Sequence, residues 1–315
     1  MQKRITLGVL LLCTVLLITS CGPKGATQNP TDTAAALKLV QTGSQGVEVS
    51  LLPNFPPPTL YDQDELNIIL NINNKGNYDL DAGSCFVQVT GFNPNIIRGG
   101  LNIPRSCAEK VGSLEGKNIY NLQGGSNQVE LKSSNINLPE GTFEFNPTLD
   151  FRTCYNYHTR ASPAVCVDPA LYQIAADQKV CSPKPVGVGG GQGAPVGIST
   201  VNVNMVGTRA VFDISVQNLG GGKVLSPYSD LQGCSQPLSF DDIDRVGYSV
   251  QFPGGSLVDC KPNGGLIRLN NGNGKIICTF NVPGTSAFES PLLVDLDYNY
   301  MQSFKKTIKI VKTPQ

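Results

Sequence analysis

The chain contains a single histidine, His158, so any acid–base chemistry performed by an imidazole would have to centre on this residue. Acidic and hydroxyl residues elsewhere could complete a catalytic triad around it, but no G-x-S-x-G turn accompanies them. Its neighbours Thr159 and Arg160 belong to the segment HTRASP, which we expect at the tip of a hairpin. Because binding residues concentrate on loops held by a rigid scaffold, we predict that His158, Thr159 and Arg160 contact a partner. Because no motif supports a catalytic triad, we predict that the chain is not an enzyme.

Two acidic groups carry the oxygen ligands that calcium prefers, namely residues 241–244 (DDID) and the pair Asp295 and Asp297. The first group lacks the alternating ligands, central glycine and closing glutamate of an EF-hand loop, which favours an acidic turn. Strand alternation explains the second group as polar positions on a sheet surface. We therefore predict no metal ligands and no cofactor, and calcium is the alternative that the sequence leaves open.

Cysteine usage indicates an oxidising compartment. Ten cysteines occur, and eight of them follow Cys21, an even number that allows complete pairing. None of the eight forms a C-x-x-C pair, and one histidine supplies too few nitrogen ligands for a typical zinc site. We therefore expect disulfides, with these candidates: Cys85, Cys107, Cys154, Cys166, Cys181, Cys234, Cys260 and Cys278.

The N-terminus predicts export. Lys3 and Arg4 precede an apolar run that ends near Ile18, which is too short to span a membrane and typical of a secretory signal. The sequence ITSC that ends at Cys21 resembles the lipobox of prokaryotic lipoproteins, which implies a signal peptide over residues 1–20 and a lipid on Cys21. A plain secretory signal is the alternative. Residues 21–46 have the composition of a flexible tether.

Composition limits the function further. Lys plus Arg and Asp plus Glu balance at 24 each, so the chain lacks the basic surface that nucleic-acid binding requires. Charged residues make up 15% of the chain and hydrophobic residues 40%, which is typical of a soluble, folded protein. The length of 315 residues suits two domains. We expect no nucleic-acid partner.

Alternating β-branched and aromatic runs separated by Asn, Gly and Pro predict an all-β fold. Strand-like runs end in Asn74-Lys75-Gly76 and again in Asn218-Leu219-Gly220. Three later landmarks recur at offsets of 144, 144 and 143 residues: Leu138-Pro139 with Val282-Pro283, Pro147 with Pro291, and Tyr155-Asn156-Tyr157 with Tyr298-Asn299-Tyr300. We predict two tandem Ig-like antiparallel β-sandwiches, residues 47–181 and 195–315, joined by a Gly/Pro linker over residues 182–194.

Strand alternation also predicts disulfide pairs. In residues 293–300 the apolar side chains Val294, Leu296, Tyr298 and Tyr300 share a face, and the equivalent register turns Phe151, Thr153, Tyr155 and Tyr157 inward. Cys154 then lies on the solvent face, and a hairpin centred near Arg160 would place it opposite Cys166. The equivalent pair in the second copy is Asp297 with Lys309, an ion pair. Further expected pairs are Cys85 with Cys107, Cys234 with Cys260, and Cys181 with Cys278.

Two segments, 154–172 (CYNYHTRASPAVCVDPALY) and 189–200 (GGGQGAPVGIST), resemble uncharacterised secreted proteins of small-genome archaea. The N-x-G strand pattern is similar to the CARDB-like Ig-like adhesion repeats of bacteria and archaea. The resemblance implies a β-sandwich surface protein with no assigned activity and no functional residue to transfer.

These observations predict a non-enzymatic lipoprotein on the extracytoplasmic face of the cell membrane. We expect a structural, adhesion or envelope-assembly module whose partner is an envelope protein or a glycan. The alternative is a surface lipoprotein that binds a carbohydrate or a peptide through its loops. Scattered tyrosines that could stack on sugars bear on this alternative: Tyr61, Tyr120, Tyr172 and Tyr228.

Overall fold

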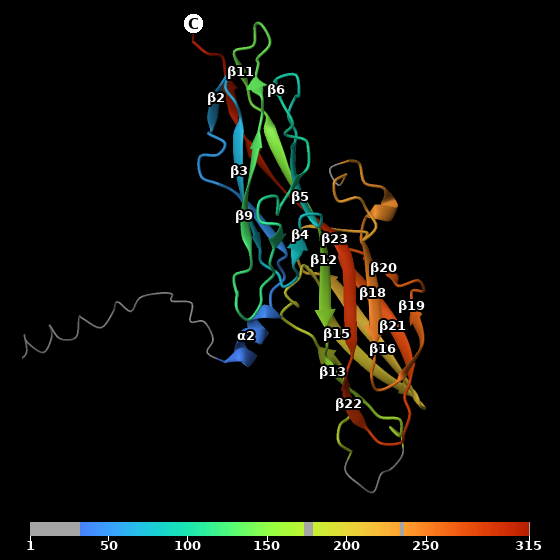
Figure 1. Ribbon diagram of the computed structural model, residues 1–315. Helices are drawn as coiled ribbons and strands as arrows, with labels where there is room; N and C mark the ends of the chain where they lie inside the picture. The colour runs from blue at the N-terminus through green and yellow to red at the C-terminus, as the bar shows by residue number, and fades with distance from the viewer. Residues whose placement is uncertain (1–31, 173–178, 234–235, 315) are drawn as a thin grey trace, which may run out of the picture.

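A computed structural model describes residues 32–172, 179–233 and 236–314. The described chain is nearly all β, with several antiparallel sheets consistent with β-sandwich architecture, which confirms the predicted fold class. It forms two elongated lobes stacked end to end (Figure 1). The expected signal peptide, Cys21 and Cys234 lie outside the described residues.

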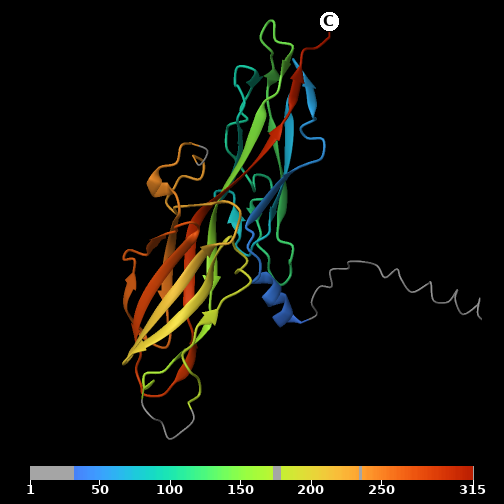
Figure 2. The ribbon, with the colours of Figure 1, turned by 180° about the vertical axis from the view of Figure 1, so that it is seen from behind.

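Lobe 1 is built from residues 47–154 and completed by residues 302–314. Its strands run mostly along the long axis of the molecule, as the two opposite views show (Figures 1 and 2). The strands of the N-terminal half are β1 (Val47–Leu51), β2 (Thr59–Tyr61), β3 (Asn67–Asn74), β4 (Leu80–Asp81), β5 (Cys85–Thr90), β6 (Ile97–Arg98), β7 (Arg105–Ser106), β8 (Ser113–Leu114), β9 (Ser126–Lys132), β10 (Asn135–Ile136), β11 (Glu144–Phe145) and β12 (Thr148–Ala161).

Lobe 2 is built from residues 186–297 and completed by residues 158–167. A short 3-10 helix, η1 (Phe240–Asp242), interrupts its strands. The remaining strands are β13 (Ala164–Val167), β14 (Val186–Gly187), β15 (Val196–Val206), β16 (Arg209–Asn218), β17 (Lys223–Leu225), β18 (Arg245–Gln251), β19 (Ser256–Lys261), β20 (Leu266–Arg268), β21 (Asn273–Asn281), β22 (Phe288–Pro291), β23 (Leu293–Thr307) and β24 (Lys309–Val311).

The long strands β12 and β23 pair with each other along the whole molecule. They run antiparallel from Thr148 opposite Thr307 to Ala161 opposite Val294, so each strand belongs to both lobes. The repeated Tyr-Asn-Tyr landmarks meet at the junction of the two lobes, which we call the waist. There Tyr155 lies opposite Tyr300 and Tyr157 opposite Tyr298. All four tyrosines are fully buried, as the predicted inward register requires.

The strand that follows each long strand crosses to the other copy. After β12, strand β13 pairs with β22, which belongs to lobe 2. After β23, strand β24 pairs with β11 and with β2 in lobe 1. Each lobe is thus completed by the last strands of the other copy, an intramolecular strand exchange. A single hydrophobic cluster runs through both lobes as a result.

The predicted hairpin around Arg160 is therefore wrong. Strand β12 continues to Ala161, and β13 pairs with β22 instead of folding back on β12. The predicted opposition of Asp297 and Lys309 fails for the same reason. Asp297 bonds His158 at 2.6 Å, and the Nζ atom of Lys309 bonds Glu144 at 2.6 Å.

Three disulfides join pairs of described cysteines. Cys85 pairs with Cys107 as predicted, with 5.3 Å between the Cα atoms. The other two pairs correct the prediction: Cys166 bonds Cys181, 15 residues away, and Cys260 bonds Cys278 in the neighbouring strand. The predicted pairs of Cys154 with Cys166, of Cys234 with Cys260 and of Cys181 with Cys278 are therefore excluded.

Cys154 also corrects an expectation about exposure. It is 1% exposed, although alternation placed it on the solvent face. A small second apolar cluster covers it, in which Leu225 is buried and Leu231, Ile243 and Met301 are partly buried. Cys154 is disulfide-bonded. Sheet alternation alone missed this because the outer face of β12 carries a second layer of chain.

The two segments expected to be flexible both pack onto the fold. Within the expected tether, helix α2 (Thr33–Val40) begins at Asp32, whose carboxylate accepts the Ala34 N–H, and it buries Ala36 and Val40. Within the expected linker, β14 pairs with β15, and Gln192 and Ala194 are buried. Short hydrogen bonds join the two segments, because the Gly43 N–H donates to Gly190 and the Gly193 N–H donates to Gly43.

Candidate functional site

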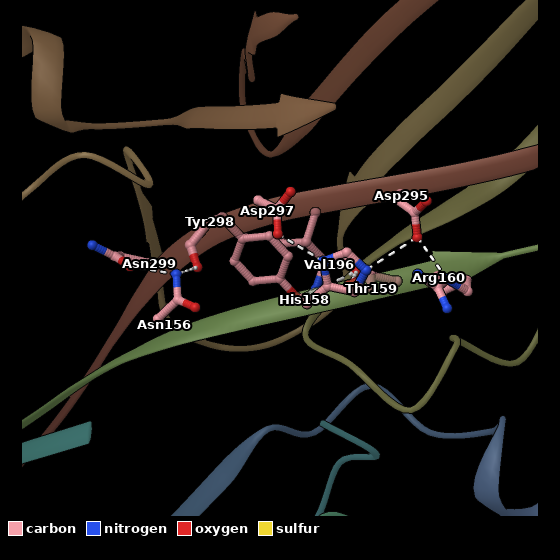
Figure 3. Close-up of polar contacts among 9 residues, drawn as sticks. All are labelled: Asn156, His158, Thr159, Arg160, Val196, Asp295, Asp297, Tyr298 and Asn299. Atoms are coloured by element: carbon pink, nitrogen blue, oxygen red, sulfur yellow. Dashed lines mark hydrogen bonds and ion pairs between the residues drawn. The ribbon is translucent and has the colours of Figure 1, made fainter. Parts of the chain in front are cut away.

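His158 lies inside strand β12, between the two aspartates of β23 (Figure 3). Its Nδ1 atom is 2.6 Å from Asp297 Oδ1 and its Nε2 atom is 3.1 Å from Asp295 Oδ1, which also accepts a 2.7 Å bond from Arg160 Nε. An imidazole has two ring nitrogens, and each nitrogen of His158 has one of the two carboxylates as its partner. Both ring nitrogens of His158 are therefore engaged by carboxylate oxygens of the neighbouring strand.

The predicted contact loop is thus a strand segment with three different environments. Thr159 is fully buried, and its hydroxyl bonds the Val196 carbonyl at 2.6 Å and the Tyr298 hydroxyl at 2.9 Å (Figure 3). His158 is largely enclosed, and only Arg160 is well exposed. The structure brings His158 and Arg160 together through Asp295, but it removes Thr159 from any surface that a partner could reach.

The N-x-G turn of each copy is held by a tyrosine from the waist. In lobe 1, the Tyr157 hydroxyl donates to Asn74 Oδ1 at 3.2 Å and accepts the Tyr78 N–H at 3.3 Å. The Asn74 side chain also accepts the Gly76 N–H and donates to the Tyr78 carbonyl. Burial raises the pKa of Tyr157, so its phenol keeps the proton that it donates.

Lobe 2 repeats the same contacts at the expected offset. The Tyr300 hydroxyl donates to Asn218 Oδ1 at 2.9 Å and accepts the Gly222 N–H at 2.9 Å. Asn218 likewise accepts the Gly220 N–H and donates to the Gly222 carbonyl. Of the remaining waist tyrosines, Tyr298 accepts the Val196 N–H at the start of β15, and the Tyr155 hydroxyl lies close to Gly46 at the start of β1. These equivalent contacts fix the correspondence between the lobes.

This correspondence relates two grooves. Groove 1 has a volume of about 400 Å³ and lies in lobe 1. It is bounded by the start of β1, the exposed edge of β23 and the N-x-G turn of lobe 2. Its walls include Val47, Val49, Gln302, Ser303 and Phe304. Groove 2, of about 410 Å³, lies at the equivalent end of β12 beside Arg160 and Ala161. Helix α2 and residues 188–192 form its other walls. The repeated N-x-G pattern was the signal for the two turns, but neither groove was visible in the sequence.

The acidic groups that were considered for calcium are engaged by protein partners. Asp241 bonds Arg245, and Asp242 accepts bonds from the backbone and side chain of Ser239 at the start of η1. These bonds lower the pKa of Asp242, led by the Ser239 hydroxyl. Asp295 and Asp297 bond His158, as described above. Across the residues with described positions, no three His, Cys, Asp or Glu side chains converge as metal ligands would.

The tyrosines that bear on sugar binding are exposed. Tyr120, Tyr172 and Tyr228 each lie in a loop with at least 85% of the side chain accessible, and Tyr61 is about half exposed on β2. They come from four separate segments of the chain.

Of the helices that the structure describes, none combines the length and apolar character needed to cross a membrane.

No protein-family model matches the chain, and no curated protein matches it significantly.

Proposed function

We propose that this protein is a non-enzymatic, lipid-anchored protein of the cell surface that serves as a structural, adhesion or envelope-assembly module. The observation that carries the proposal is the exchange of terminal strands between the lobes. Fourteen residue pairs join β12 to β23, and β13 and β24 each complete the opposite lobe. The lobes can separate only if these ladders break, which suits a protein that transmits or bears load between a membrane and a partner.

The disulfides support an extracytoplasmic location, because disulfides form and persist in oxidising compartments. The lipobox-like sequence at Cys21 supplies the anchor in this proposal. Export and lipidation place the folded lobes outside the cytoplasm, where α2 is the first described element beyond the anchored end. The engagement of both His158 nitrogens supports a non-catalytic role for this histidine.

Intact-mass spectrometry on protein from the native membrane fraction tests the location, under reducing and non-reducing conditions. We expect a chain that starts at Cys21, carries acyl groups and loses eight hydrogens through oxidation of its eight remaining cysteines. A Cys21→Ser variant provides the control and should leave the membrane fraction. A mass that retains residues 1–20 together with free thiols would overturn the proposal.

A second candidate function is capture of a carbohydrate through surface loops. The exposed rings of Tyr120, Tyr172 and Tyr228 favour it, since aromatic faces stack on sugars. A glycan array with the full mature chain distinguishes the two functions. Binding that is lost in Tyr120→Ala or Tyr228→Ala, but kept in Tyr248→Phe, would favour glycan capture over a purely structural role.

A further inference from the structure

We propose that groove 1 is a strand-docking site, in which an extended, uncharged segment of another protein chain pairs with the free edge of β1. This inference rests on the proposed function as an assembly module and names the kind of partner. Such pairing uses backbone hydrogen bonds for affinity and side-chain pockets for specificity. The equivalent strand edge is covered in lobe 2 and open in lobe 1.

Strand β1 has one paired edge and one open edge. It pairs antiparallel with β3, where the Lys75 N–H donates to Gly46 and the Leu52 N–H donates to Ile69. In this register Gly46, Glu48, Ser50 and Leu52 exchange bonds with β3, so the backbone groups of Val49 and Leu51 point away from it. Within residues 32–172, 179–233 and 236–314, no other strand pairs with this edge.

The equivalent edge of lobe 2 is covered by the protein's own chain. Ile198 on β15 occupies the place of Val49, because Leu219 donates to Pro195 as Lys75 donates to Gly46. The Gln192 side chain spans that edge: its Oε1 atom accepts the Ile198 N–H at 2.7 Å, and its Nε2 atom donates to the Ile198 carbonyl at 3.2 Å. Farther along the edge, Val188 donates to Ser199, and Val186 pairs with Val201.

The difference in cover is visible in the burial of the walls. Ile198 in lobe 2 is fully buried, and Ala161 across groove 2 is 4% exposed. In lobe 1, Val49 and Phe304 are only partly buried. An open strand edge beside partly exposed apolar side chains favours pairing with a further strand.

The segment that precedes β1 does not provide the missing cover. By position it corresponds to residues 186–193, which precede β15, but it packs at the other lobe's groove. The backbone of Gly43 exchanges bonds with Gly190 and Gly193, and the Thr42 carbonyl accepts a 2.9 Å bond from Lys117. Helix α2 lines groove 2 through Ala34, Leu37 and Lys38. The occupant of groove 1 therefore comes from outside this part of the chain.

The cover of lobe 2 indicates the chemistry of the occupant. Its sequence from Val186 to Gln192 is VGVGGGQ. These residues are uncharged glycines and β-branched valines, followed by a glutamine that supplies a carboxamide. A carboxamide can satisfy a backbone N–H and a carbonyl at once, which a carboxylate cannot do because it only accepts. We infer that the partner segment has the same features: extended backbone, small apolar residues and one Gln or Asn.

The test uses the full mature chain and a synthetic peptide with the sequence of residues 185–194, PVGVGGGQGA, blocked at both ends. Hydrogen-exchange mass spectrometry should show protection of residues 47–51 when the peptide is added. A peptide with Gln192→Glu should bind at least about tenfold more weakly, and equal binding by both peptides would overturn the carboxamide requirement.

Two protein variants locate the docked strand. Val49→Pro removes the N–H on the open edge of β1 without removing a bond to β3, and it should weaken peptide binding at least about tenfold. Ser303→Pro is the matched control on the facing edge of β23 and should leave binding unchanged. The reverse pattern would place the strand on β23 and overturn the proposal. Protection of residues 47–51 in the wild-type protein is read independently of how either variant folds.

The remaining outcomes are decisive as well. Absence of protection at saturating peptide would overturn the docking site. Protection that grows with protein concentration in the absence of peptide would assign the edge to a second copy of this chain. Protection that is independent of concentration and is lost on removal of residues 22–31 would assign the edge to the N-terminal segment. Either result overturns the proposed occupant. A chain that is lipidated and oxidised but does not bind peptide refutes this inference alone, whereas an unprocessed chain with free thiols refutes the proposed function.

Discussion

Lobe 1 and lobe 2 share a frame and differ in how that frame is closed. Both hold an N-x-G turn with a waist tyrosine, and both receive their last strand from the other copy. In lobe 2 the received strand β13 is fastened by the Cys166–Cys181 disulfide and by the 2.6 Å ion pair of Lys179 with buried Asp168. In lobe 1 the received strand β24 is fastened by Asp62 without a disulfide of its own.

The difference shows which parts of the duplication are constrained. The turn contacts are buried and mutually dependent, so both copies keep them. The fastenings lie at the ends of the exchanged strands, where either a covalent bond or a group of hydrogen bonds suffices. As a consequence, the two exchanged strands should respond to different chemical stresses: the attachment of β13 to reduction and the attachment of β24 to acid.

The largest expected effect is loss of the lobe 2 fastening. We expect the double substitution Cys166→Ser and Cys181→Ser to lower the free energy of unfolding by about 3 kcal/mol, because the bond closes a loop of about 15 residues. Chemical denaturation measures this loss, and hydrogen exchange should rise in β13 and β22. The double substitution Cys260→Ser and Cys278→Ser is the control, since it should leave exchange in β13 unchanged. Equal exchange in all three proteins would show that the disulfide does not fasten β13.

The turn contacts give the next largest effect and test the shared frame. A Cβ atom at Gly76 would collide with the Tyr157 hydroxyl, and one at Gly220 with the Tyr300 hydroxyl, whereas one at Gly221 would meet nothing within 4 Å. We expect Gly76→Ala and Gly220→Ala each to destabilise the protein by about 2 to 3 kcal/mol, as overpacking does in well-packed cores. Gly221→Ala should change stability by less than about 0.5 kcal/mol.

Thermal and chemical unfolding of the three glycine variants measure these effects. If Gly76→Ala were tolerated as well as Gly221→Ala, the tyrosine contact would not constrain the turn of lobe 1. If only one of the two tight glycines were sensitive, the lobes would differ in their frame as well as in their closure.

The frame was predictable from the sequence to the extent that it depends on local pattern. Alternation placed Tyr155, Tyr157, Tyr298 and Tyr300 in the core, and the two N-x-G segments end strands as expected. The partners of the strands were not predictable. A hairpin from β12 to β13 satisfies alternation as well as the observed pairing of β13 with β22, and only the packing of both copies decides between them.

The surroundings of the candidate site residues depend on these long-range strand pairings. Alternation predicts an exposed Cys154 because it describes a single layer. In the structure, a second layer of chain covers this side of β12. The cover by Gln192 lies in a glycine-rich segment whose composition is typical of a linker, and its order comes from bonds to Ile198 and Gly43. Composition reports which conformations a segment tolerates, but tertiary contacts select one of them.

The lobe 1 fastening should make the protein sensitive to acid. Asp62 is buried, accepts bonds from the backbone and hydroxyl of Thr313, and pairs with Lys312 at 2.6 Å. These contacts, led by Lys312, lower the pKa of Asp62 from 3.8 to about 2. Because the folded-state pKa is depressed, the stabilisation is fully present above about pH 4 and is lost as the pH falls toward 2.

We therefore expect Asp62→Asn to remove part of the acid dependence and to raise exchange in β24 at neutral pH. Denaturant unfolding at several pH values between about 2 and 6 measures the slope. Glu144→Gln is the control, since Glu144 also has a lowered pKa through Lys309 but is more exposed and should contribute less. An unchanged slope in Asp62→Asn would show that Asp62 does not fasten the exchanged strand.

The smallest expected effect is at His158, where the two ends of the waist differ most in chemistry. His158 and Asp297 lie opposite each other on β12 and β23, and Met301 and Cys154 form the equivalent pair at the other end. The first pair is polar and partly exposed, whereas the second is largely covered by apolar side chains. Exposed ion pairs contribute little, so we expect His158→Asn to cost about 1 kcal/mol or less.

Salt sharpens this last test, because ions screen exposed charges. Stability of the wild-type protein should fall slightly with added salt, and His158→Asn should reduce that dependence. Met301→Ala removes packing against Cys154 and Leu225 and should leave the salt dependence unchanged, which makes it the matched control. A loss well above 1 kcal/mol in His158→Asn would mean that the aspartates are left uncompensated in a site more enclosed than its exposure indicates.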